Sequence, residues 1–145
     1  MIVCRLSKAS FVALDGEGAC LYGGRWNTPG RPMVYTAQSP SLPVLEVLVH
    51  LDLPLGLMPD DHRLLAIDVP DGAPMETLAA TPADIRACQT TGDDFLIRGA
   101  SLALIAPSVL VSLDNNVRHV AMANIRVISN DPFSFDPRLI APSGR

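Results

Sequence analysis

The chain has few charged residues, few aromatic residues and almost no lysine. Charged residues make up 18% of its 145 residues, aromatic residues make up 5%, and the single lysine is Lys8. The formal net charge is -4. Because contacts to nucleic-acid phosphates need clustered lysine and arginine, this balance argues against a nucleic-acid-binding surface.

Cysteine is scarce as well, and its pattern excludes two kinds of site. Cys4, Cys20 and Cys88 are scattered and odd in number. They therefore predict neither a disulfide framework nor a pair of zinc ligands. The three histidines are equally dispersed, and no metal site is expected.

Long hydrophobic runs are also missing. No uninterrupted apolar span reaches membrane length. Met1 is not followed by a basic region and a hydrophobic stretch of about 7 to 15 residues, as a signal peptide requires. We therefore expect no membrane contact and a cytoplasmic protein whose thiols stay reduced.

The hydrophobic residues that are present are sufficient for one core. A hydrophobic content of 48% in 145 residues predicts a single domain over residues 1–145. Many short strands, few helices and no Gly-rich phosphate loop before a long helix favour an α+β fold with a mixed sheet over a Rossmann domain.

The pattern of apolar and turn-forming residues places the elements. One helix is predicted from about Leu42, and a second from Thr81 as N-cap to about Gly92. Strands are predicted at Ile2–Leu6, Met33–Ala37, Arg63–Val69, Leu102–Ile105, Val109–Leu113 and Ile125–Ile128.

Glu46 is the only charged side chain between Leu42 and Leu51, in what the pattern predicts to be a mostly buried helix. Removing an unpartnered carboxylate from water costs several kcal/mol, so such an acid normally faces a polar cavity or holds a specific donor. Alternatively, Glu46 lies on a narrow solvent-facing stripe of the helix and pairs with His50, one turn further on.

Three more residues upstream are candidates for a site. Gly23-Gly24 forms a turn and delivers Arg25, whose planar fork of donors suits phosphate or carboxylate, and Trp26, which either lines a pocket or fills the core. Tyr35 lies in a short strand, where a tyrosine most often contributes packing.

Several motifs in this order resemble the RES domain, a family named for its arginine, glutamate and serine. The motifs are GEGA (16–19), GGRWN (23–27), VYTA (34–37), LEVLVHL (45–51), TGDDF (91–95), APS (106–108) and FDPRL (135–139). They extend over nearly the whole chain, and their combination is far more specific than any one of them.

The resemblance implies a toxin of a bacterial toxin–antitoxin pair that acts on NAD and has a fold similar to ADP-ribosyltransferases. It implies Arg25, Glu46 and Ser108 as the name-giving residues, with Tyr35 as the aromatic of an Arg-Tyr-Glu site. Trp26 and Asn116 are further candidates for binding substrate. It also implies an Xre-type helix-turn-helix antitoxin that covers the active site, in a hetero-oligomer.

Two positions depart from the pattern of the family. Phe95 stands where the family often has tryptophan, which keeps an aromatic ring but loses the indole donor. After Asn115 to Val117 the family commonly shows Asn-Pro and a histidine, whereas this chain has Arg118-His119-Val120. The role of this segment, predicted to be a loop, is therefore open.

The chemistry of NAD cleavage matches the residue types. Breaking the bond between nicotinamide and ribose builds positive charge on the ribose in an oxocarbenium-like transition state. The protein must then supply a negative charge near the ribose, a cation for phosphate and an aromatic face for nicotinamide. Glu46, Arg25 and Tyr35 are these three types, and Ser108 either offers a hydroxyl to the substrate, orients Arg25 or Glu46, or simply forms a bend after Pro107.

Three functions remain compatible with the sequence. The first is an enzyme that consumes NAD as substrate, with no cofactor, and passes ADP-ribose to phosphate or water. The second is a transferase that attaches ADP-ribose to a protein. The third is a non-catalytic module that binds a nucleotide or its antitoxin.

Overall fold

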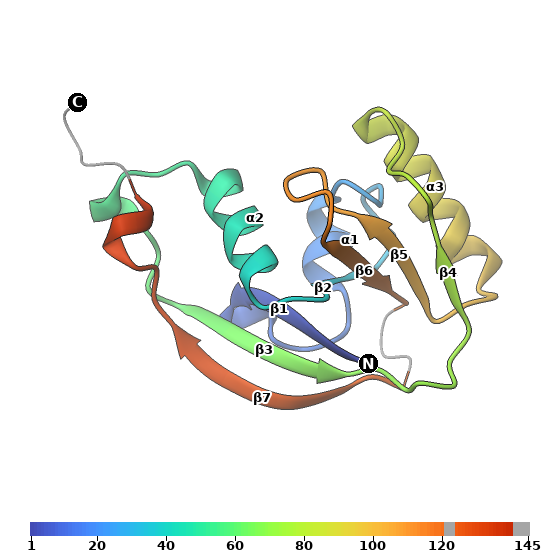
Figure 1. Ribbon diagram of the computed structural model, residues 1–145, viewed down its shortest axis with the longest axis horizontal. Helices are drawn as coiled ribbons and strands as arrows, with labels where there is room; N and C mark the ends of the chain where they lie inside the picture. Colours follow the sequence, from blue (N-terminus) through green and yellow to red (C-terminus); the bar gives the residue numbers. More distant parts are fainter. Residues whose placement is uncertain (121–123, 141–145) are drawn as a thin grey trace.

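The strands of the protein pair into one mixed sheet in the order β4-β5-β6-β2-β1-β3-β7 (Figure 1). The structure is a computed structural model, and it describes residues 1–120 and 124–140. Only β4 and β5 run parallel, and every other neighbouring pair is antiparallel. The strands are β1 (Ile2–Lys8), β2 (Val34–Ala37), β3 (His62–Asp68), β4 (Met75–Thr77), β5 (Ala103–Pro107), β6 (Asn115–His119) and β7 (Arg126–Phe133).

Three α-helices accompany the sheet in the described residues, so the predicted α+β class is confirmed. In Figure 1, α2 lies over β1 and β3, and α3 lies beside β4 and β5. Short 3-10 helices occur at Ala9–Phe11, Leu55–Leu57 and Pro137–Leu139. The α-helices are α1 (Glu17–Tyr22), α2 (Ser41–Leu51) and α3 (Ile85–Arg98). No helix in these residues is long and apolar enough to cross a membrane.

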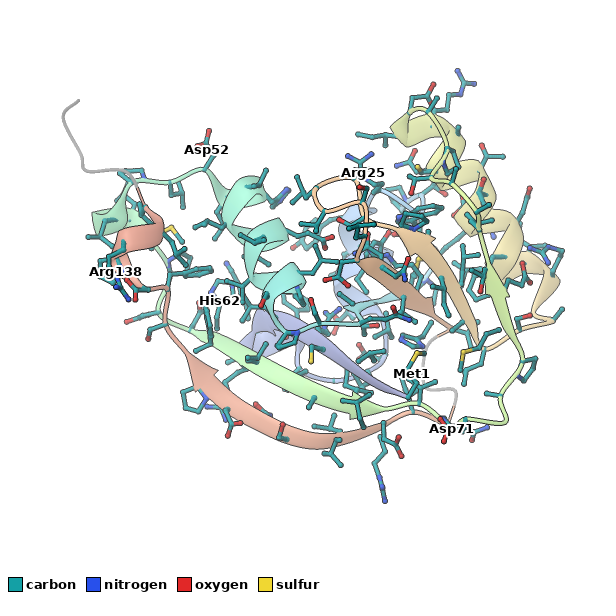
Figure 2. The ribbon with its side chains drawn as sticks, viewed as in Figure 1. Met1, Arg25, Asp52, His62, Asp71 and Arg138 are labelled. Atoms are coloured by element: carbon teal, nitrogen blue, oxygen red, sulfur yellow. The ribbon has the colours of Figure 1, made fainter. Side chains whose placement is uncertain are left out.

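The sheet is continuous at its ends but loosely joined in the middle. β1 pairs with β3 along all seven of its residues, and the amino group of Met1 donates to Asp71 beside the end of β3 (Figure 2). By contrast, β1 meets β2 at a single pair, Cys4 and Ala37. Backbone groups of β2 beyond this pair are therefore open to side chains or ligands.

Two clusters of buried side chains form the core. One joins β1, β3, β5 and β6 through Val3, Leu65, Ile67, Val69, Leu102, Ala103 and Val117. The other packs α3 against β5 and the segment after α1, through Trp26, Met33, Cys88, Phe95, Leu104 and Ala106. Phe95 is fully buried in this second cluster, so this aromatic position serves packing.

The second predicted helix is displaced in the structure. α3 begins at Ile85, because Asp84 is the N-cap and its side chain accepts a hydrogen bond from the backbone N–H of Ala87 at 2.8 Å. Thr81 instead donates its hydroxyl to the carbonyl of Pro107. The helix also continues through Gly92 to Arg98, so the prediction that it stops near Gly92 is wrong.

Gly92 lies inside α3 because the backbone of Trp26 leaves no room for a side chain at this position. A Cβ atom at this position would lie 1.7 Å from the backbone oxygen of Trp26, so only glycine lets the helix approach this segment. The glycine that looks like a helix stop is therefore a packing residue.

After β5, the structure has a loop where a strand was predicted and a strand where a loop was predicted. Val109–Leu113, predicted as a strand, is an exposed loop, in which the Ser108 hydroxyl accepts from the N–H groups of Leu110 and Val111 at 3.1 and 3.4 Å. The predicted loop after it is β6, whose residues pair with both β2 and β5. Pairing on both sides outweighs the weak strand propensity of its polar residues.

The other predicted elements correspond to the observed ones with shifted ends. The segments Ile2–Leu6, Met33–Ala37, Arg63–Val69 and Leu102–Ile105 fall on β1, β2, β3 and β5, and Ile125–Ile128 falls on the longer β7. The first predicted helix is α2, and Pro43 lies in its first turn. It is less buried than predicted, because only Leu42 and Pro43 are buried. Neither α1 nor β4 was predicted from the sequence.

Candidate active site

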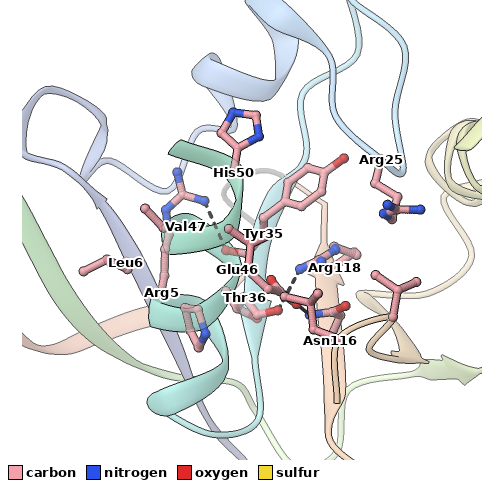
Figure 3. A pocket seen from close by; sticks show the side chains of 14 residues that line it. Arg5, Leu6, Arg25, Tyr35, Thr36, Glu46, Val47, His50, Asn116 and Arg118 are labelled. Carbon is pink, nitrogen blue, oxygen red and sulfur yellow. Dashed lines mark hydrogen bonds between the residues drawn. The ribbon is translucent and has the colours of Figure 1, made fainter. Parts of the chain in front are cut away.

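A pocket of about 420 Å³ lies where β1 and β2 separate (Figure 3). Its walls come from β1, β2, β6 and α2, from the loop after α1 and from the loop after β5. Six of the residues that line it have charged or aromatic side chains: Arg5, Arg25, Tyr35, Glu46, His50 and Arg118. Residues more than 110 positions apart in the sequence thus share one cavity.

Glu46 faces this pocket from the middle of α2 and is only partly exposed. Its Oε1 accepts a hydrogen bond from Nδ2 of Asn116 at 2.7 Å and a longer one from the hydroxyl of Ser108 at 3.4 Å. Oε2 forms no hydrogen bond with the described residues. One carboxylate oxygen is therefore held in place and the other is available to a ligand. Its partners are these two residues, and the alternative of a pair with His50 is not what the structure shows.

Ser108 is positioned to hold Glu46 and not to attack a substrate. It is 4% exposed, and its Oγ accepts from two backbone N–H groups of the following loop. The hydroxyl hydrogen then points to Glu46. Of the roles considered for Ser108, the structure supports orientation of Glu46.

The GGRWN segment shapes the loop that carries Arg25. Gly23 follows α1 with φ +70°, a backbone conformation that favours glycine. A Cβ on Gly24 would lie 2.6 Å from the hydroxyl oxygen of Tyr35, so this residue must also be small. Arg25 then lines the pocket, and its side chain lies close enough to the buried thiol of Cys88 to oppose the rise in the pKa of that thiol that burial causes. It forms no ion pair with a carboxylate among the described residues, so its charge and its fork of donors suit an anionic ligand.

Hydrogen bonds from Asn27 and from α3 fix the loop that carries Arg25. Asn27 is fully buried, and its Nδ2 donates to the carbonyls of Ala19 and Arg31 at 2.8 and 2.9 Å. On α3, Asp93 accepts from the N–H and the hydroxyl of Thr28 at 3.1 and 2.7 Å. Asp93 of the TGDDF motif therefore lies outside the pocket and fixes the segment that carries Arg25.

Tyr35 offers the pocket its ring and not its hydroxyl. The hydroxyl donates to Oδ1 of Asn27 at 2.5 Å and accepts from the backbone N–H of Trp26 at 2.9 Å. Burial raises the pKa of Tyr35, although the charge of Arg118 opposes this. The phenol is therefore neutral and fixed, and one face of its ring is covered by the guanidinium of Arg118, 4.3 Å from the ring centre.

Sequence reasoning missed two arginines of the pocket. Arg118 lies opposite Tyr35 in the pairing of β6 with β2, which puts both side chains on one face of the sheet. Arg5 reaches across the gap between β1 and β2 and donates to the carbonyl of Tyr35 at 3.1 Å. Arg5 could have been found, because it is the only charge between Ile2 and Leu6, the same argument that singled out Glu46.

These charges make the pocket positive although the whole chain is negative. Burial lowers the pKa of both Arg5 and Arg118, but arginine keeps its proton in proteins. Three guanidinium groups and one carboxylate line the cavity, whereas the chain has a formal net charge of -4. The pocket therefore suits a ligand with more than one negative charge.

The remaining candidate, Trp26, is not among the residues that line the pocket. It is 1% exposed and packs in the core cluster beneath α3. Of its two proposed positions, in the core or in a pocket wall, the structure shows the core. The other candidates, Arg25, Tyr35, Glu46, Ser108 and Asn116, are brought together.

Comparisons with known proteins agree with this fold and show the family of the chain. The model of the RES domain matches residues 2–136. A protein named Toxin Res from Photorhabdus laumondii is 37% identical over 97% of each chain, and one from Pseudomonas putida is 35% identical over 96% of this chain and 99% of its own. The chain therefore belongs to the RES domain family, and these curated relatives are toxins.

Two further matches extend the comparison. A Prs ADP-ribosylating toxin from Sphingobium sp. is 31% identical over 88% of this chain and 86% of its own. A crystal structure of the M. tuberculosis MbcT–MbcA toxin–antitoxin complex matches with a TM-score of 0.74 and 22% identity, over 95% of this chain and 85% of that chain. At this identity the structural match shows a shared fold.

Proposed function

We propose that this protein is the toxin of a toxin–antitoxin pair and that it cleaves NAD at the bond between nicotinamide and ribose. ADP-ribose passes to phosphate or water. Membership of the RES domain family and the toxins among its relatives support the first part. The chemistry of the pocket supports the second.

The observation that carries the proposal is the placement of Glu46 beside Tyr35 and Arg25 in one positive pocket. A carboxylate with one oxygen held by Asn116 and Ser108 is preorganised to face a developing positive charge. In this proposal the free oxygen of Glu46 accepts from a ribose hydroxyl and stabilises the oxocarbenium ion. Nicotinamide is itself a good leaving group, so the protein needs no strong nucleophile.

Arg25 and Tyr35 bind the two ends of the reacting part of NAD. Arg25 contacts phosphate or ribose oxygens with a guanidinium that forms no ion pair with a carboxylate of the described residues. Tyr35 stacks on nicotinamide with the ring face that Arg118 leaves uncovered. NAD is then a substrate and not a resident cofactor, and a reaction that consumes it belongs in the cytoplasm.

Incubation of the purified, antitoxin-free protein with NAD tests the proposal directly. Released nicotinamide together with free ADP-ribose, or with its 1″-phosphate when phosphate is present, is the expected result. No loss of NAD would contradict it and favour a non-catalytic module that binds a nucleotide or the antitoxin.

Transfer of ADP-ribose to a protein is the second candidate. It is favoured by one observation, the relative named a Prs ADP-ribosylating toxin. The same site would serve, because the two reactions differ only in the acceptor. Incubation with a bacterial lysate and labelled NAD separates them, since label on a protein band indicates the transferase.

An antitoxin partner follows from the same proposal. We propose an Xre-type antitoxin that covers the pocket in a hetero-oligomer, and the structural match to a toxin–antitoxin complex supports an antitoxin of some kind. Any control of a promoter would then depend on this partner, because the chain itself is acidic.

A further inference from the structure

Arg118 is a buried cation without a carboxylate to pair with it. The side chain is 5% exposed and forms no salt bridge within the described residues. Its Nη1 donates to the carbonyl of Thr36 at 2.7 Å, whereas its Nε is buried and finds no acceptor in the same part of the chain. One hydrogen bond and one aromatic ring do not replace the water that a guanidinium loses on burial.

The surroundings of Arg118 point to an anion that arrives with a ligand. The residue lines the pocket, and its guanidinium carbon lies over the ring of Tyr35, 4.3 Å from the ring centre. Glu46 is the one carboxylate whose charge acts on Arg118 appreciably, and Arg5 and Arg25 both act against it. The planar fork of arginine matches two oxygens of a phosphate.

The position of Arg118 near Glu46 further restricts which anions could bind there. A bare cation beside Glu46 would oppose the positive charge that the proposed reaction builds on the ribose. A phosphate bound to Arg118 removes this conflict, because its negative charge faces the same centre. The cation is then useful in the reaction only when an anion occupies it.

We propose that Arg118 is a substrate-binding residue that holds a phosphate group in the pocket; this rests on the proposed function. The phosphate belongs either to the dinucleotide or to free inorganic phosphate, and both present the same oxygens. No motif of the RES family assigned a role to this position, which the sequence marked only as a departure.

The test compares Arg118→Met with Arg86→Met. Arg86 is an exposed arginine of α3 outside the pocket, so its variant removes the same charge without touching the site. Isothermal titration measures the dissociation constants for ADP-ribose and for inorganic phosphate, and thermal unfolding is followed without ligand. Steady-state kinetics with NAD gives kcat and KM for each protein.

A ligand-binding role and a structural role give opposite results. If Arg118 holds phosphate, Arg118→Met weakens ADP-ribose binding about ten- to a hundredfold and raises the KM for NAD. Its unfolding temperature stays equal or rises, because an unpaired buried charge is gone, and Arg86→Met behaves as the wild type. Loss of affinity for inorganic phosphate alone, with ADP-ribose binding unchanged, supports the role and identifies free phosphate as the source.

The proposal is overturned if Arg118→Met binds both ligands within about twofold of the wild type, whatever its unfolding temperature. Should this variant fail to fold, Arg118→Lys keeps the charge and removes the fork, and wild-type affinity for both ligands in that protein would overturn it equally. Loss of NAD by the wild type is measured alongside. A wild type that turns over NAD while Arg118 variants bind normally refutes this inference and leaves the proposed function standing.

Discussion

Replacement of Glu46 by glutamine changes the charge of the proposed site and little else. Oε1 of Glu46 accepts from Asn116 at 2.7 Å and from Ser108 at 3.4 Å. The carbonyl oxygen of glutamine can accept the same two hydrogen bonds. The pocket should therefore keep its shape, and the variant should unfold at nearly the same temperature as the wild type.

The expected loss of activity follows from Coulomb's law. A unit negative charge about 4 Å from the developing positive charge of the ribose stabilises it by about 4 kcal/mol at an effective dielectric constant of about 20. Losing this interaction in the transition state slows the reaction about a thousandfold. In the proposed complex, Glu46 contacts the ground state of NAD only through a ribose hydroxyl, so the loss should fall on kcat more than on KM.

Release of nicotinamide, measured by chromatography, gives the rate of each protein. Asp52→Asn is the matched control, because it makes the same carboxylate-to-amide change at the exposed end of α2, away from Arg25 (Figure 2). Asn also tolerates the left-handed backbone of Asp52, with φ 44°. Turnover by Glu46→Gln within about threefold of the wild type would refute the electrostatic role.

Three further predictions concern the loop, the core and the pH dependence. Arg25→Lys keeps the charge but loses the fork, so the KM for NAD should rise roughly tenfold in steady-state kinetics. Gly92→Ala places a Cβ 1.7 Å from the backbone oxygen of Trp26, so chemical denaturation should show a loss of about 3 kcal/mol or more, or no folded protein. Burial lowers the pKa of His119 to about 4, helped by the charge of Arg118. Between the unfolded pKa of 6.5 and this value the unfolded chain binds more protons. Stability should therefore fall by about 3 kcal/mol as the pH drops from 6.5 to 4, as thermal unfolding at several pH values would measure.

Each of these three has its own control. Arg31→Lys makes the same change on the same loop outside the pocket and should leave the KM unchanged. Gly56→Ala meets nothing within 4 Å and should fold as the wild type does. For His119, substitution by glutamine should flatten the pH dependence; an unchanged slope in that variant would contradict the assignment.

Strands that contain an apolar run could be predicted from the sequence. β1 begins with the apolar run Ile2–Cys4, β3 contains the apolar run Leu64–Ile67, and α2 has a proline in its first turn. β6 could not be predicted, because Asn115–His119 is mostly polar. It forms a strand by pairing with β2 on one side and β5 on the other. The mostly apolar Val109–Leu113 next to it is an exposed loop, and the hydroxyl of Ser108 accepts from two backbone N–H groups of this segment.

The residues of the site also fall into those that the sequence could identify and those that only the fold could place. Glu46 could be identified because a charge in an apolar helix is unusual locally, whereas Arg25 was singled out by the GGRWN motif and its resemblance to the RES domain. Asn116 and Arg118 could not be placed, because their roles depend on the register of β6 against β2 and on its distance from α2. Gly92 was misread for the same reason, since its neighbour Trp26 lies far away in the sequence.

By itself, the order of residues determined the class of fold, the family resemblance and the acid at position 46, because these depend on composition, periodicity and short motifs. Tertiary structure alone decided what surrounds that acid: two hydrogen-bond donors on one oxygen and three guanidinium groups around a shared cavity. Electrostatic interactions act through space, and only folding sets the distances between charges that lie far apart in the chain.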